Sequence, residues 1–154
     1  MEKFGNKPDA KYFGLLYCKS NDQIIWGANN FQLPPFKGFI VWKRKTIGET
    51  FTMSMCAIAS LSERLGTTSK WVEIALQDRE RFHPTQKPIK LYEWIFKNYA
   101  KPNDKILDTH LGSGSSRIAA DKANLPFVGC ELDPDYFYAS VKRFNEYSAQ
   151  QTMF

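Results

Sequence analysis

The sequence predicts an α/β protein with a parallel sheet, and three observations in its second half carry that prediction. Two short apolar runs, 105–108 and 127–131, read as strands and are separated by a turn rich in glycine and serine and then a helical segment. A helix with an apolar stripe precedes the first run, and a helix opened by proline follows the second. Helices that alternate with strands are typical of parallel sheets, because each helix returns the chain to the same end of the sheet.

The first third contains two short strands after a lead-in. Residues 12–19 fit either the end of a helix or an edge segment. Residues 23–26 form a β-rich run that ends at Gly27, and residues 38–42 form an apolar run short enough for a buried strand. Between them, residues 33–36 must be a loop, because two prolines remove donors and fix φ.

The middle of the chain is less clear. In residues 51–65 the apolar side chains alternate as in a strand over 53–59, whereas larger ones recur at helical spacing towards the end of the segment. Both alternatives stay open. Residues 71–76 are predicted to form another short strand, and residues 77–81 a charged loop.

The helices of the second half have recognisable boundaries. Residues 88–99 carry an apolar stripe with a proline in the first turn. Residues 116–123 form a shorter helix, which Asn124-Leu125-Pro126 ends. Asp133 is the candidate N-cap of the last helix, which is expected to run to about Tyr147 and has a proline just inside its start.

Length and composition fit one soluble domain. The chain has 154 residues, of which 43% are hydrophobic, so we expect a single domain with a lead-in (1–21) and two halves (22–80 and 81–147). No apolar run approaches the roughly 20 residues that span a bilayer. The N-terminal residues do not resemble a secretory signal, and we expect a cytoplasmic protein that does not contact a membrane.

The three cysteines, Cys18, Cys56 and Cys130, are scattered and show no CxxC spacing. That pattern supports neither a disulfide framework nor a zinc site. We expect reduced, mostly buried thiols and no metal, because free cysteine is among the residues most often buried.

The charge is compatible with a nucleic-acid partner. The net charge is +5 and 15% of the residues are aromatic. Lysine and arginine neutralise phosphates, and aromatic faces stack on bases. The basic residues gather in the cluster Lys43-Arg44-Lys45 and in a looser one formed by Arg79, Arg81 and Lys87. A solvated basic surface without a ligand is the alternative.

The glycine turn after the first strand of the second half is the candidate ligand site. Asp108 ends that strand, and the turn Gly112-Ser113-Gly114 leads into a helix whose N-terminal N–H groups lack partners. Glu131 ends the next strand, at roughly the 20-residue separation at which an acidic residue takes ribose hydroxyls. The pattern is not GxGxxG, so a mononucleoside fits better than a dinucleotide. A tight turn without a ligand remains the alternative.

The hexapeptide His83-Pro84-Thr85-Gln86-Lys87-Pro88 stands directly before the first clear helix. Thr85 or Gln86 is suited to cap that helix, and Lys87 to place a positive charge at the same sheet end as Asp108. A lone histidine in such a place is most often a hydrogen-bonded loop residue. Six residues of this type in a row form a far more specific signal.

This hexapeptide, followed by residues 106–116 and 127–133, resembles the DNA amino-methyltransferases. These enzymes use S-adenosylmethionine to methylate the exocyclic amine of adenine or cytosine. The order of the segments is similar to that of their circularly permuted subgroup, especially short phage and prophage members. Two upstream segments, 25–31 and 38–43, are also similar, so the resemblance covers most of the chain.

The resemblance implies a Rossmann-like, S-adenosylmethionine-dependent methyltransferase sheet that acts on double-stranded DNA. Residues 22–80 would form the half that faces the target, and residues 81–147 the half that binds the cofactor. Glu131 would take the ribose hydroxyls, with Leu132 or Asp133 beside the adenine. The implied cofactor-binding residues are His83, Thr85, Lys87, Asp108, His110, Gly112, Ser113, Gly114, Glu131 and Asp133.

One element of the family is missing from this sequence. Catalysis in the family rests on a tetrapeptide of Asp, Asn or Ser, two prolines and an aromatic residue, upstream of a Trp-Gly-x-Asn segment; it stacks the flipped base and accepts its amine protons. Nothing before Trp26 contains it. Leu33-Pro34-Pro35-Phe36 is similar, but leucine accepts no hydrogen bond and the segment lies downstream. We therefore assign no catalytic residue and expect an N-terminally abbreviated sheet, with a second chain as one source of the missing strand.

Three functions follow as alternatives. The first is S-adenosylmethionine-dependent methylation of an exocyclic amine in DNA, adenine in preference to cytosine, in a phage or restriction-modification setting, with Trp26, Asn29 and Asn30 as candidates to line the base pocket. The second is a non-catalytic relative that binds the cofactor or DNA. The third, a nucleotide-dependent oxidoreductase, is disfavoured by the hexapeptide and by the absence of GxGxxG.

Overall fold

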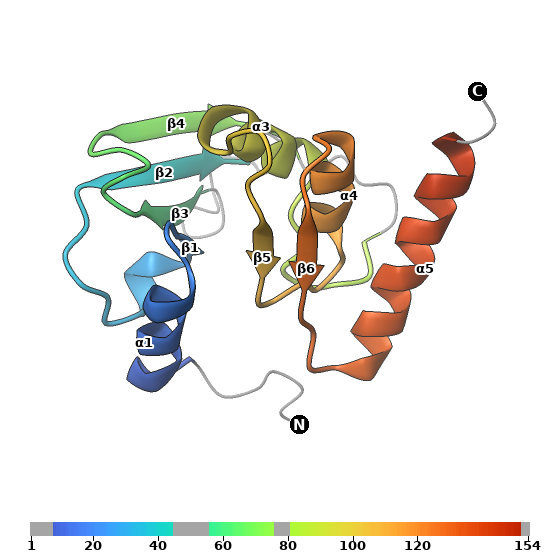
Figure 1. Ribbon diagram of the computed structural model, residues 1–154, viewed down its shortest axis with the longest axis horizontal. Coiled ribbons are helices and arrows are strands. Elements are labelled where there is room, and N and C mark those ends of the chain that lie inside the picture. Colours follow the sequence, from blue (N-terminus) through green and yellow to red (C-terminus); the bar gives the residue numbers. More distant parts are fainter. Residues whose placement is uncertain (1–7, 45–55, 76–80, 152–154) are drawn as a thin grey trace. The chain divides into compact units, whose positions relative to one another are not determined.

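The computed structural model describes residues 8–44, 56–75 and 81–151. The chain divides into two compact units, residues 1–73 and residues 74–154. Each unit has its own sheet, and Figure 1 labels the helices and strands of both.

In its described residues, the first unit is a mixed four-stranded sheet with one α-helix and a short 3-10 helix. Its elements are α1 (Ala10–Lys19), β1 (Ile24–Trp26), the short 3-10 helix η1 (Ala28–Asn30), β2 (Gly38–Lys43), β3 (Cys56–Leu61) and β4 (Ser69–Glu73). The strand order is β1-β3-β2-β4. β3 is antiparallel to both of its neighbours, whereas β2 and β4 are parallel.

The burial pattern of β2 explains why its residues form a strand. Alternate residues are buried, with Ile40 and Trp42 at 0% and 1% exposure, and the residues between them are half-buried. This period of two is that of a pleated strand with one face in a core. At its first residue, Gly38, a Cβ atom would lie 2.0 Å from the carbonyl oxygen of Gly66, so only glycine fits there.

Within residues 81–151, the second unit combines three helices with a two-stranded parallel sheet. Its elements are α3 (Ile89–Tyr99), β5 (Ile106–Asp108), α4 (Ser115–Lys122), β6 (Phe127–Gly129) and α5 (Pro134–Gln151). β5 and β6 pair in parallel with Leu107 opposite Val128 (Figure 1). α4 packs on α3 and on β6, and the buried residues between them include Leu91, Ile95 and Ile118. Among the described residues, no helix is both long and apolar enough to cross a membrane.

The structure confirms the α/β class and resolves the open alternatives. Residues 12–19 belong to helix α1, and the ambiguous segment 51–65 is a strand from Cys56, while its residues 51–55 lie outside the described ranges. The expectation of a parallel sheet holds for β5 and β6 but not for β3. The sequence could not show this, because an apolar pattern is the same in both pairing directions.

Of the two predicted helix N-caps, the structure confirms one and contradicts the other. Asp133 caps α5 as predicted, since its carboxylate accepts hydrogen bonds from the backbone N–H of Asp135 (2.9 Å) and Tyr136 (3.3 Å). The prediction that Thr85 or Gln86 caps α3 is wrong, because Pro88 occupies the N-cap position. Both side chains are instead used within the hexapeptide loop.

The prediction of mostly buried thiols is also wrong. Cys18, Cys56 and Cys130 are all exposed. Cys18 lies near the end of α1, Cys56 is the first residue of β3, and Cys130 directly follows β6. These three positions are open to solvent although free cysteine is a residue type that is often buried.

Candidate functional site

The turn between β5 and α4 depends on two glycines. Gly112 and Gly114 have φ values of +52° and +72°, in the left-handed region that favours glycine. Space is also restricted: a Cβ atom on Gly112 would lie 3.3 Å from the ring of His83, and one on Gly114 would lie 3.2 Å from Cβ of Ser140. The turn is therefore fixed by its backbone conformation and by close neighbours on both sides.

Asp108, the last residue of β5, joins the turn to the first residues of α4. Its Oδ1 accepts a hydrogen bond from the backbone N–H of His110 (3.0 Å), and its Oδ2 accepts one from the hydroxyl of Ser116 (2.5 Å). Burial raises the pKa of the Tyr92 hydroxyl, and the nearby charge of Asp108 adds to that increase. Through its two hydrogen bonds, Asp108 links the end of β5 to His110 and to the first turn of α4.

Glu131 joins the turn to the segment that follows β6. Its Oε2 accepts a hydrogen bond from the N–H of Gly112 (2.8 Å), and its Oε1 accepts one from the N–H of Asp133 (3.0 Å). Each carboxylate oxygen has two lone pairs, so both retain acceptor capacity for an outside donor. Beside it, the apolar side chain of Leu132 is 98% exposed.

The backbone N–H groups at the start of α4 provide donors. Within residues 81–151, no backbone hydrogen bond uses the N–H of Ser113, Ser115 or Ser116. These groups lie at a helix N-terminus, where the helix dipole favours a negative charge. The hydroxyl of Ser113 is buried and lies 3.1 Å from that of Ser115, so the donor that Ser113 offers is its N–H.

His83, the first residue of the hexapeptide, packs beneath the turn. Its ring lies edge-on to Tyr136 with centroids 4.4 Å apart. Its Nδ1 accepts a hydrogen bond from the N–H of Thr85 (3.3 Å), and the Thr85 hydroxyl lies 3.2 Å from the same atom. An accepting Nδ1 places the proton of the neutral ring on Nε2, a tautomer assigned from these contacts.

Burial lowers the pKa of His83 below its ordinary value of 6.5. The positive charges of Lys87 and Arg81 lower it as well, whereas the carboxylates of Glu131 and Asp133 oppose the shift. The imidazole is therefore neutral at pH 7, and it acts as an aromatic spacer rather than as a cation.

All of the predicted cofactor-binding residues lie in the second unit. Glu131 is hydrogen-bonded to Gly112 in the turn, and Asp108 is hydrogen-bonded to His110 and Ser116. The ring of His83 lies beside Gly112. The ring of His110 is exposed, and its Nδ1 lies 3.1 Å from the hydroxyl of Thr109. That the predicted cofactor-binding residues bind a ligand stays a prediction.

Sequence reasoning missed Ser116, Tyr136 and Arg143. The Ser116 hydroxyl donates to Asp108, and the ring of Tyr136 packs edge-on against that of His83. Arg143 donates to the carbonyl of Ser113 at 3.0 Å. The available signal was the spacing of Tyr136, Ser140 and Arg143, which recur at i, i+4 and i+7 on α5 and so share one helix face.

The residues expected to line a base pocket lie in the first unit. Trp26 ends β1 and meets Trp42 edge-on at 6.1 Å, and Asn29 and Asn30 are exposed in η1. The segment 33–36, which is similar to the catalytic tetrapeptide, lies elsewhere on this unit. Its residues Pro34, Pro35 and Phe36 line a cavity of about 180 Å³ with Tyr17 and Glu63.

The described basic residues already contact neighbours within the chain. Lys43 pairs with Glu73 at 3.8 Å, and the guanidinium of Arg44 lies 5.0 Å from the ring of Trp42. Arg81 donates to the carbonyls of His83 and Pro84. Of the other three residues that the sequence grouped with them, Lys87 lies in the hexapeptide loop, whereas Lys45 and Arg79 lie outside the described residues.

The fold and the site together define a class. A strand, a glycine turn and a helix, with an acidic residue at the end of the next parallel strand, form the nucleoside-binding arrangement of α/β proteins. The profile of the N6/N4 DNA methylase family matches residues 18–142. The chain therefore belongs to the DNA amino-methyltransferases, and the family predicted from its motifs is confirmed.

Individual relatives show the same relationship. The chain is 26% identical over 141 residues to the type II methyltransferase M.HinfI of Haemophilus influenzae, which covers 81% of this chain and 39% of that protein. The M1.HpyAVI complex with S-adenosylmethionine is 25% identical, with a TM-score of 0.50 over 68% of this chain and 60% of that one. The PvuII cytosine-N4-specific DNA methyltransferase shares the fold at 16% identity, with a TM-score of 0.57 over 71% of this chain and 51% of that one. The chain thus spans between about two fifths and three fifths of the length of these proteins.

Proposed function

We propose that the second unit binds S-adenosylmethionine at the glycine turn and at the end of β6. The observation that carries this proposal is the network in which Glu131 joins Gly112 to Asp133 and keeps acceptor capacity. Ribose hydroxyls are donors that such a carboxylate takes. The exposed Leu132 beside it gives an apolar surface for the adenine.

The chain also offers hydrogen-bonding and charged groups for the methionine end of the same ligand. The amides of Ser113, Ser115 and Ser116 are donors for the carboxylate of its methionine moiety. Asp108 supplies a negative charge for the amino group. Further support comes from M1.HpyAVI, which is 25% identical and whose structure is a complex with S-adenosylmethionine.

The reaction that we propose is methylation of an exocyclic amine in double-stranded DNA. When bound, S-adenosylmethionine supplies the methyl group. The amine nitrogen of the base would accept this group and lose a proton, so that a carbon–nitrogen bond replaces the carbon–sulfur bond of the cofactor. We infer adenine rather than cytosine as the target from the resemblance of the motifs, and a type II modification system in the bacterial cytoplasm as the setting, because M.HinfI is a type II methyltransferase.

This chain does not visibly contain the acceptor that orients the amine. The sequence has no Asp-Pro-Pro-aromatic element or its Asn or Ser equivalent. β1 lies at the end of its sheet, with a neighbouring strand on one side in the described part of the chain. We propose that a second chain contributes the missing strand and tetrapeptide.

A non-catalytic relative that binds cofactor or DNA is the second candidate. The lack of the tetrapeptide is the observation that favours it. Orientation of reacting groups is worth several powers of ten in rate, so cofactor binding alone does not produce turnover.

Calorimetry and a methyl-transfer assay test these proposals. The chain should bind S-adenosylmethionine or its demethylated product but not NAD, and a failure to bind either of the first two would contradict the cofactor assignment. With radiolabelled cofactor and mixed-sequence DNA, we expect little incorporation by the chain alone. Robust incorporation alone would overturn the need for a second chain, and digestion of the DNA would identify the modified base as N6-methyladenine or N4-methylcytosine.

A further inference from the structure

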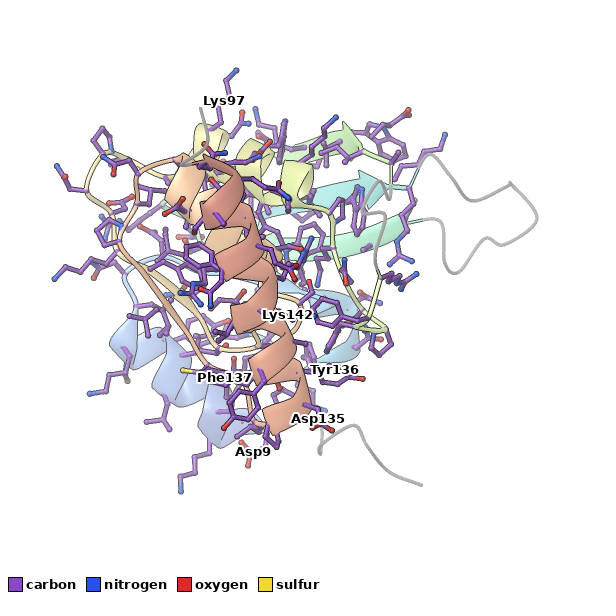
Figure 2. The ribbon with its side chains drawn as sticks, turned by 90° about the vertical axis from the view of Figure 1, so that its right-hand side faces the viewer. Asp9, Lys97, Asp135, Tyr136, Phe137 and Lys142 are labelled. Carbon is purple, nitrogen blue, oxygen red and sulfur yellow. The ribbon has the colours of Figure 1, made fainter. Side chains whose placement is uncertain are left out.

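One face of α5 contacts the glycine turn and the His83 ring beside it. Tyr136, Ser140 and Arg143 recur at i, i+4 and i+7 and therefore share that face; Figure 2 shows α5 with Tyr136 labelled near its start. Tyr136 packs against the His83 ring that lies beneath Gly112. Ser140 is 1% exposed and packs beneath Gly114.

Arg143 makes the polar contacts of this face. Its Nη1 donates to the carbonyl oxygen of Ser113 (3.0 Å) and to the hydroxyl of Ser115 (2.9 Å). Ser113 and Ser115 are 4% and 2% exposed, and their hydroxyls lie 3.1 Å apart. A hydrogen bond from a charged donor to a buried acceptor is roughly twice as strong as one between neutral groups. Arg143 is therefore hydrogen-bonded to the residues on both sides of Gly114, which has a φ of +72°.

We propose that Arg143 is a positioning residue for the cofactor: it fixes the turn so that the amides of Ser113, Ser115 and Ser116 face the ligand. The proposal rests on the proposed function of the turn. Arg143 acts through Ser113 and Ser115, and no direct contact with the ligand is required. It also lies outside the segment matched by the family profile, which ends at residue 142.

The physical reason is preorganisation. The turn contains two residues with positive φ, and the three amides have no backbone acceptor within residues 81–151. Without the guanidinium, the turn samples more conformations, and a ligand must then order it on binding. That ordering reduces affinity although no ligand contact has been removed.

The test uses the full chain and four variants. Arg143→Met removes the donor and keeps much of the side-chain length. Arg143→Lys keeps a charged donor, and an ammonium group can donate to both acceptors. Ser115→Ala removes one acceptor from the other side of the contact. Lys142→Met is the matched control on the same helix, where Figure 2 labels Lys142. The side chain of Lys142 is 80% exposed, and its ion partner is Glu146.

Two measurements are made on each variant. Titration with S-adenosylhomocysteine, the demethylated product, gives the dissociation constant. Amide hydrogen exchange of the unliganded chain reports the order of residues 112–116 separately from that of α3. We expect Arg143→Met to weaken binding roughly ten-fold and to speed exchange in 112–116 but not in α3. Arg143→Lys should recover most of the affinity, and Lys142→Met should bind like the unmodified chain.

The outcomes separate this proposal from the proposed function. Unchanged affinity in Arg143→Met, or equal losses in Arg143→Lys and Arg143→Met, would overturn the positioning role. Exchange that rises equally in α3 would show a merely structural role. If Arg143→Met does not fold, Ser115→Ala provides the test. We expect this variant to bind S-adenosylhomocysteine about three-fold more weakly and to exchange faster in 112–116 but not in α3. If the unmodified chain binds no S-adenosylhomocysteine, the proposed function fails, and the exchange comparison alone still tests whether Arg143 orders the turn.

Discussion

Glu131 connects two segments and is also the proposed acceptor for the ribose. Its carboxylate accepts from the N–H of Gly112 at 2.8 Å and from that of Asp133 at 3.0 Å. Glu131→Ala removes both contacts together with any bond to the ligand. We expect it to weaken cofactor binding by about 1–3 kcal/mol, the usual loss for charge-assisted hydrogen bonds.

Calorimetry with S-adenosylhomocysteine measures this effect. Glu131→Gln, which keeps one acceptor oxygen and the side-chain shape, should lose less than Glu131→Ala. Equal affinity in the alanine variant and the unmodified chain would remove Glu131 from the site.

His83 makes the stability of the second unit depend on pH. Its pKa is lower in the folded chain than its ordinary value of 6.5, so the folded state binds fewer protons than the unfolded state. The stability that the neutral ring contributes is therefore complete above pH 6.5, and it is lost as the pH falls through the folded-state pKa. Urea unfolding between pH 8 and about pH 5.5 should show this decline.

The control for this prediction is the other histidine of the chain. His83→Gln should flatten the decline between pH 8 and about pH 5.5, whereas His110→Gln, at an exposed position, should keep it. A decline of the same size in His83→Gln and in the unmodified chain would contradict the assignment.

At the scale of elements, the two glycines Gly114 and Gly14 should respond to alanine in opposite ways. Gly114 has a φ of +72° and lies close to Ser140, whereas Gly14 lies within α1 and a Cβ atom there would meet nothing within 4 Å. Gly114→Ala should destabilise the fold by about 1–2 kcal/mol, because the left-handed conformation is strained for alanine. Gly14→Ala should stabilise it by about 0.5–1 kcal/mol.

Shifts of the urea midpoint, measured on both variants under the same conditions, test this pair. The second variant shows that a loss at Gly114 does not come from adding a methyl group as such. Equal and small shifts in both variants would contradict the argument.

The sequence predicted the elements of the second unit better than those of the first. Glycine, proline and capping signals surround β5, β6 and the helices α3 to α5, and these signals act locally. The cap formed by Asp133 depends on residues two and three positions away, and it was predicted correctly. The direction of β3 depends on pairing with distant strands, which a local pattern does not specify.

The same distinction applies to the candidate site. Asp108, Gly112 and Glu131 stand out in the sequence because they lie at strand ends or in the turn. From α5, Arg143 contacts that turn and Tyr136 contacts His83, and these contacts appear only when the helix is packed in place. A residue that supports a site through tertiary packing leaves only a helical spacing in the sequence, and many unrelated helices show the same spacing.

At the scale of the whole molecule, the net charge of +5 favours association with DNA. Lys43 already pairs with Glu73 at 3.8 Å, and both side chains are partly exposed. An exposed pair of this kind contributes only about 0–1 kcal/mol, so a phosphate can replace the carboxylate at low cost. We therefore expect the internal pair to weaken DNA binding without abolishing it.

Titration of a DNA duplex at several salt concentrations tests this last prediction. Affinity should fall linearly on logarithmic axes as salt rises, because each phosphate contact releases counterions. Lys43→Gln should reduce that slope by roughly one. Glu73→Gln should strengthen binding at low salt, since it frees the Lys43 ammonium. The matched control is Lys37→Gln, which removes an equal charge beside the start of β2 from a pair with Glu63 whose side chains are 72% and 69% exposed. Affinity that does not depend on salt would contradict DNA binding through these charges, and equal slopes in Lys43→Gln and Lys37→Gln would show that net charge, rather than the position of Lys43, determines it.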